Sequence, residues 1–83
     1  WVKVRALEAL GQHRVKEAIP DVVALLDNPN KLIAIRAIEC LGSIGGTTAF
    51  RALLAVSGGE DYELMGPAEA AIAQIQEEQE KDN

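Results

Sequence analysis

The sequence predicts an all-α protein, an α-α superhelix (solenoid) of about two and a half helical hairpins, and three observations lead to this prediction. The 83-residue chain repeats itself with a period of 31, so that VRALEALG at 4–11 returns as IRAIECLG at 35–42. Apolar residues recur at helical spacing within each copy. Glycine and proline interrupt the pattern between the helices. Such fixed-period similarity is typical of stacked repeats, because one hairpin cannot bury its apolar face alone.

Repeat one, residues 1–30, contains two predicted helices. The segment VKVRALEALG places its apolar residues on one face and stops at Gly11. The segment KEAIPDVVALLDN forms the second helix and carries Pro20 near its start, where a missing amide hydrogen is tolerated. The segment DNPN then interrupts the helical pattern, and Asn30 is a suitable N-cap for the helix that follows.

Repeat two, residues 31–61, follows the same plan. Its first helix is KLIAIRAIECLGSIG, and Thr47 is expected to cap its second helix, which ends at Ser57-Gly58-Gly59. Asp61 is expected to cap the last helix of the chain.

The C-terminal capping helix, residues 62–81, is irregular. Gly66-Pro67 stands where the earlier copies have Val-Arg and Ile-Arg, which predicts a kink or a restart. After Ile75 the apolar pattern stops, and a polar outer face is what a terminal repeat needs. We therefore expect a single helical-repeat domain over residues 1–83, the C-terminal part of a longer array.

Small residues recur at fixed places in the copies. Alanine is found at positions 6, 37 and 68, which predicts that adjacent helices approach closely there. Glycine is found at positions 11 and 42, and we interpret it as the end of the first helix of each copy.

Composition and charge exclude several functional classes. Residues 1–59 carry seven Lys/Arg and five Asp/Glu, whereas residues 60–83 carry one Lys and eight Asp/Glu. This distribution lacks the clustered basic residues of a nucleic-acid groove, so no nucleic-acid partner is expected. No apolar run is long enough for a membrane span. The single cysteine, Cys40, cannot form an internal disulfide, which favours a reducing, cytoplasmic location.

Individual polar residues are interpreted structurally. Arg5 and Arg36 each precede a glutamate by three residues, so intrahelical ion pairs are favoured over an anion-binding row. Cys40 aligns with alanines and is expected to be buried and unreactive. His13 aligns with isoleucines and is expected to be half-buried rather than a metal ligand. The glycine pairs at 45–46 and 58–59 follow helices rather than strands, which favours turns over phosphate loops.

The segments VRALEALG, AIPDVVALLDNPN and IRAIECLG resemble the short HEAT-like repeats of the phycobilisome-lyase type. The resemblance covers essentially residues 1–76. It implies a right-handed superhelix whose second helices line the concave face. It also implies a range of roles, because members of this family include chromophore-lyase subunits as well as scaffold and regulatory proteins.

No set of residues predicts catalysis, a cofactor site or a metal site. We therefore predict that the chain is not an enzyme and has no cofactor, and that it is a non-catalytic protein–protein interaction or scaffold module. The alternative is an accessory subunit or domain of a chromophore-lyase-type enzyme, to which the resemblance points.

The candidate binding surface lies on the second helices, if these line the concave side. Its residues are small or of mixed charge, which suits a helix or an extended peptide of an unidentified protein partner. They are Glu17, Pro20, Asp21, Ala24, Thr48, Arg51, Ala52 and Ala55. Self-association through the Trp1 end is a competing explanation for binding.

Overall fold

The computed structural model describes residues 5 and 13 and the stretch 16–81, with side chains up to residue 78. Predictions about the first helix, Gly11 and the Trp1 end lie outside these residues. The elements are, in chain order, η1 (Lys16–Ala18), α2 (Ile19–Ala24), η2 (Leu25–Asp27), α3 (Lys31–Ile44), α4 (Gly46–Ser57) and α5 (Tyr62–Lys81), where η marks a 3₁₀-helix. The described part of the chain therefore consists of helices joined by short loops and contains no strand, and the all-α prediction is confirmed.

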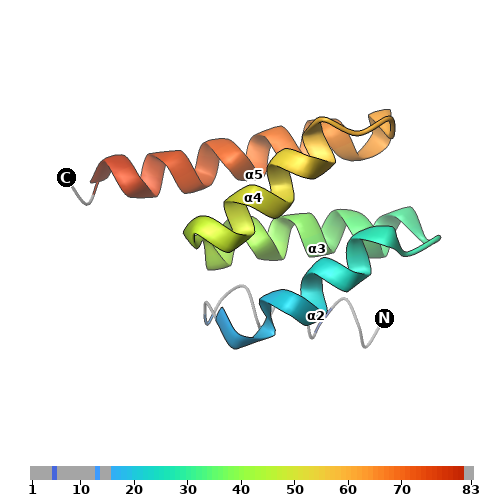
Figure 1. Cartoon of the computed structure of the whole chain (residues 1–83), viewed down its shortest axis with the longest axis horizontal. Helices are drawn as coiled ribbons and strands as arrows, with labels where there is room; N and C mark the ends of the chain where they lie inside the picture. The colour runs from blue at the N-terminus through green and yellow to red at the C-terminus, as the bar shows by residue number, and fades with distance from the viewer. Residues whose placement is uncertain (1–4, 6–12, 14–15, 82–83) are drawn as a thin grey trace.

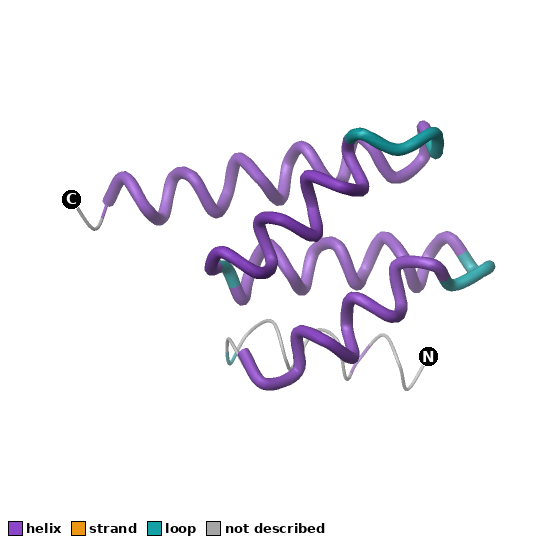
Figure 2. Tube along the Cα trace, in the orientation of Figure 1, coloured by secondary structure: helices purple, strands orange, loops and turns teal. Residues whose placement is uncertain are grey.

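The helices form two layers (Figure 1). In this view α2 and α4 lie in front, and α3 and α5 lie behind them. Helix α5 packs against both α3 and α4, and α3 also packs against α2. The loops at 28–30 and 58–61 lie at one end of the molecule, and the turn at Gly45 lies at the other (Figure 2). Matching parts of successive copies thus lie side by side, as stacking of repeats requires.

The second helix of repeat one is shorter than predicted. Instead of one α-helix over KEAIPDVVALLDN, the chain forms η1, α2 and η2 in succession. Pro20 lies in the first turn of α2. Its ring nitrogen has no hydrogen to donate to the carbonyl of Lys16, so the α-helical ladder cannot extend back through this point.

Two of the three predicted caps are confirmed. The side chain of Asn30 accepts a hydrogen bond from the amide of Leu32 at 3.0 Å, and Asp61 Oδ1 accepts one from the amide of Glu63 at 3.0 Å. The prediction for Thr47 is wrong, because α4 begins at Gly46 and its N-cap is Gly45.

The turn before α4 explains the Thr47 error. Gly45 and Gly46 both have positive φ, 74° and 89°, so the chain reverses its direction within these two residues. The helix has already started when Thr47 is reached.

The predicted restart at Gly66-Pro67 is also wrong, because α5 runs without interruption through Pro67. The missing amide hydrogen of Pro67 deprives the carbonyl of Glu63 of its helical partner. Glu63 is exposed, so water can bond this carbonyl instead. A Cβ at Gly66 would meet nothing within 4 Å, so no neighbouring element requires a break here.

The core is aliphatic, as the composition predicts. Its largest fully buried side chains are Val22, Ile38, Leu41, Leu53 and Ile75. The described alanines of the recurring series, at 37 and 68, are both completely buried, in agreement with close packing at these positions.

The interpretation of Gly42 as a helix end is wrong. Gly42 is buried within α3, and that helix continues to Ile44. A Cβ on Gly42 would lie 2.8 Å from Cβ of Ala71, which is closer than any real contact. Glycine is present here because α3 and α5 approach each other too closely for a side chain.

No helix among the described residues combines the length and apolar character that crossing a bilayer requires.

Candidate partner-binding face

The front layer positions the residues predicted to bind a partner. Glu17 belongs to η1, and the others belong to α2 and α4. Seven of the eight are exposed, namely Glu17, Pro20, Asp21, Ala24, Thr48, Arg51 and Ala55. Ala52 is half-buried and packs against the core. These positions are open to water because the buried residues of the same helices, such as Val22 and Leu53, face inward.

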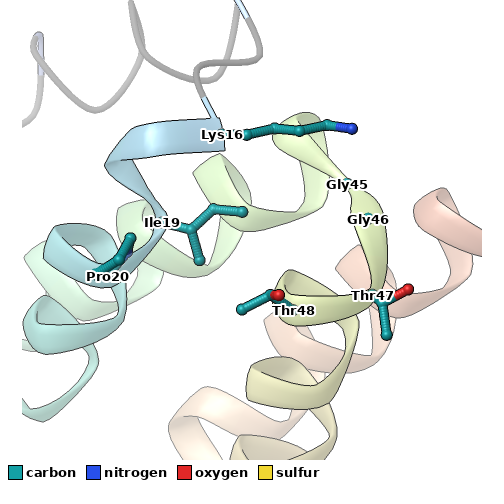
Figure 3. Close-up of a pocket in the computed structure, with 7 residues that line it drawn as sticks. All are labelled: Lys16, Ile19, Pro20, Gly45, Gly46, Thr47 and Thr48. Carbon is teal, nitrogen blue, oxygen red and sulfur yellow. The ribbon is translucent and has the colours of Figure 1, made fainter.

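Two hollows lie between the first and second copies. The first, which we name the Gly45 hollow, has a volume of about 360 Å³. Its lining residues are Lys16, Ile19, Pro20, Gly45, Gly46, Thr47 and Thr48. The side chains of Ile19 and Thr48 point towards each other across it, whereas Thr47 points away from Ile19 (Figure 3).

The Gly45 hollow has a positive character. Lys16 is its one charged residue, and its side chain extends towards the turn at Gly45 (Figure 3). The N-terminus of α4 also opens here, and its N-cap residue, Gly45, has no side chain that could bond the first amides. The N-terminal end of a helix carries a partial positive charge, which adds to that of the ammonium group.

The second hollow, which we name the Asp27 hollow, has a volume of about 340 Å³. Its apolar lining comes from the C-terminal parts of the two second helices, and its charged lining comes from η2 and the loop after α4. The residues are Val23, Leu26, Asp27, Ala52, Ala55, Val56, Gly59, Glu60 and Asp61.

The electrostatics of the Asp27 hollow are set by three carboxylates. Asp61 pairs with Lys31, which joins the start of α3 to the cap of α5. The hydrogen bond with Lys31 lowers the pKa of Asp61, and the same bond raises the pKa of Lys31. Within the part of the chain that the structure describes, Asp27 and Glu60 form no ion pair. The rim therefore keeps a negative charge that Lys31 does not balance.

The structure distributes the predicted residues unevenly over this face. Pro20 and Thr48 line the Gly45 hollow, and Ala52 and Ala55 line the Asp27 hollow. The other four, Glu17, Asp21, Ala24 and Arg51, are exposed on the same elements but line neither hollow.

Sequence reasoning missed all of the charged residues that line the two hollows. Lys16 and the acids Asp27, Glu60 and Asp61 were not assigned to the site. The 31-residue period could have indicated that these acids lie close together, because residues 27–30 and 58–61 are matching segments at the ends of successive copies. Stacking brings matching loops to the same end of the molecule, as Figure 2 shows.

The remaining polar residues have structural surroundings. Arg36 pairs with Glu39 at 2.8 Å, which confirms the predicted intrahelical pair. Cys40 is buried with 4% of its surface exposed, and burial raises the pKa of its thiol. The expected half-burial of His13 is wrong, since His13 lies exposed in a turn, where its side chain reaches water. Among the described residues, no three His, Cys, Asp or Glu side chains are grouped to hold a metal ion.

Comparison with known proteins gives one result. A family model described as HEAT repeats matches residues 1–74. No curated protein and no solved structure gives a significant match.

Proposed function

Because the chain belongs to the HEAT-repeat family, whose members generally mediate protein–protein interaction or scaffolding, we propose that it is a non-catalytic interaction module. The proposed binding surface is the outer side of the front layer, made by η1, α2 and α4. In the family arrangement this is the concave side of the superhelix.

The observation that carries the proposal is the exposure of this row across two successive copies. Glu17 and Asp21 from the first copy, and Thr48 and Arg51 from the second, all reach solvent. A row of small and charged residues over successive helices suits a helix or an extended segment laid across it. The two hollows flank the row and can receive side chains of that segment.

The repeat division belongs to the same proposal. Repeat one covers residues 1–30, repeat two covers residues 31–61, and the capping helix covers residues 62–81. In this division α2 and α4 are the second helices of successive copies, which is why they present equivalent surfaces.

Capture of partners from a lysate of the source organism tests the proposal. The bait is compared with a variant in which Glu17→Gln, Asp21→Asn and Arg51→Gln remove the charges of the row. All three residues are exposed, so the variant is expected to fold normally. Loss of a partner in mass spectrometry supports the proposal, and undiminished capture refutes the assignment of this face.

A control variant distinguishes binding at this face from a general effect of surface charge. Glu69→Gln and Glu77→Gln remove exposed charges from α5, in the back layer. This variant should capture the same partners as the native chain. Equal loss in both variants would point to non-specific electrostatic capture and would contradict the proposed site.

The finer placement within the phycobilisome-lyase type rests on the sequence resemblance alone. It implies an accessory role in a chromophore-lyase-type enzyme. Absorbance titration with a bilin tests that role, because a bound tetrapyrrole changes its spectrum, and a flat titration argues against it.

A further inference from the structure

We propose that the Asp27 hollow binds an aliphatic side chain of a partner segment whose neighbouring residues are lysine or arginine. This inference rests on the proposed function and narrows it to one class of partner. Two observations support it together: the floor of the hollow is apolar, and its rim has a negative charge that Lys31 does not balance.

The floor of the hollow is apolar. Val23, Leu26, Ala52 and Val56 are partly buried, so each leaves apolar surface facing the hollow, and Ala55 is exposed. The two alanines leave the space open, since a larger side chain at either place would fill it. Removing such a surface from water favours binding of an aliphatic group. At about 340 Å³ the hollow lies at the small end of ligand sites, which suits a side chain better than a large cofactor.

The rim determines the charge of the partner. Asp27 and Glu60 are exposed and form no ion pair with any described residue, whereas Asp61 is paired with Lys31. Two negative charges are thus available beside the apolar floor. A Lys or Arg adjacent to the bound aliphatic residue would lie well within the screening distance of about 8–10 Å. An acidic segment would be repelled at the same place.

The other hollow on this face has the opposite character, since Lys16 and the N-terminus of α4 border it. A basic segment is therefore favoured at the Asp27 hollow and disfavoured at the Gly45 hollow. This difference makes the inference specific to one end of the face.

Heteronuclear NMR of the full chain is a suitable test because it detects weak binding residue by residue. The probe is a short peptide in which one leucine is flanked on each side by lysines. Two comparison peptides replace the leucine with serine or the lysines with glutamate. We expect shift changes at Val23, Leu26, Ala55 and Val56 with the first peptide only. Binding of the glutamate peptide at the same amides, or absence of shifts with the first peptide, overturns the inference.

Matched variants test the two components separately. Asp27→Asn or Glu60→Gln should weaken binding of the leucine–lysine peptide by up to about fivefold each, the range for one exposed ion pair. Glu69→Gln, at an exposed position of α5 outside the hollow, should leave it unchanged. Ala55→Arg should abolish binding by filling the hollow, whereas Ala73→Arg, at an exposed position of α5, should not. If a variant in the hollow and its control outside the hollow weaken peptide binding equally, the assigned location of the binding site is contradicted.

Failure of this inference can be distinguished from failure of the proposed function. If partner capture depends on the exposed row but the leucine–lysine peptide does not bind, the function stands and the inference falls. Shifts of the same amides that grow with protein concentration, without peptide, would identify a second copy as the occupant and also overturn it. If neither capture nor peptide binding occurs, both proposals fail.

Discussion

Substitution of Gly42 by alanine tests how α3 and α5 are held together. Alanine is favoured over glycine inside a helix by about 1 kcal/mol. The new Cβ, however, would lie 2.8 Å from Cβ and 3.1 Å from Cα of Ala71. Carbon atoms prefer separations of about 3.5–4.0 Å, so α5 must move away by up to about 1 Å. Overpacking of this kind costs about 1–3 kcal/mol, which exceeds the gain in helix propensity.

We therefore expect Gly42→Ala to lower the free energy of unfolding by about 1 kcal/mol, within a range of roughly 0–2. For a domain of this size, 1 kcal/mol corresponds to a decrease in Tm of about 4–8 °C. Urea denaturation followed by circular dichroism measures the free energy, and a thermal scan measures Tm.

A double-mutant cycle with Ala71→Gly isolates the contact. Ala71→Gly alone should cost about 2 kcal/mol, because it loses helix propensity and a buried methyl group. In the double variant the helix-propensity terms cancel and the methyl group moves from α5 to α3, leaving only the 3.1 Å approach to Cα of residue 71, so the total loss should be about 0–1 kcal/mol rather than the sum of about 3. A double variant that is additive within about 0.5 kcal/mol, or a stabilised Gly42→Ala, would refute close approach as the reason for this glycine.

Four further predictions concern single residues. Gly45→Ala should lower the free energy of unfolding, measured by urea denaturation, by about 1–3 kcal/mol. The backbone angles of Gly45, φ of 74° and ψ of −166°, strain any residue that has a Cβ. A loss below about 0.5 kcal/mol would contradict this prediction. Asn30→Ala should cost about 1 kcal/mol by removing the cap of α3, and Asn30→Asp should restore it. Lys31→Gln should reduce stability at neutral pH by removing the partner of Asp61. Because the pKa of Asp61 is lowered in the folded chain, its contribution is present above about pH 4 and is lost as pH falls through that lowered value. Because the pKa of Lys31 is raised, its contribution is present below about pH 10 and is lost above. The stability difference between native chain and variant should therefore vanish in strong acid, and a difference that persists there would argue against the ion pair. Cys40 should react with a thiol reagent far more slowly in the native chain than in urea, and equal rates would show that it is accessible.

The architecture could be predicted from the sequence because the period is a global signal. Apolar spacing and loop positions recur in every copy, so errors at one place are corrected at another. The starts of α3 at Lys31 and α5 at Tyr62, one period of 31 apart, reflect this. Caps with polar side chains, at Asn30 and Asp61, were also predictable, since they depend only on local chemistry.

The wrong predictions concern positions where the local sequence allows more than one structure and tertiary contacts determine which one forms. Glycine is common both at helix ends and at close helix crossings, and only the position of Ala71 shows which applies at Gly42. Proline usually interrupts a helix, but at Pro67 the orphaned carbonyl belongs to an exposed residue and the helix continues. The start of α4 depends on the paired positive φ values of Gly45 and Gly46, which the letters GGTT do not specify.

The same distinction applies to the candidate site. Helical spacing correctly predicted exposure for six of the seven candidate residues on α2 and α4, with Ala52 half-buried, because exposure follows from the position of each residue relative to the buried stripe. Spacing within a helix cannot predict the charge of the hollows, because their lining combines helices with loops from different copies. Lys16 meets the turn at Gly45, and Asp27 meets Glu60, only after the copies stack. Under the proposed function, partner choice depends on residues at the ends of the hairpins as well as on the helix faces, and substitution of these loop residues is expected to change specificity without altering the core.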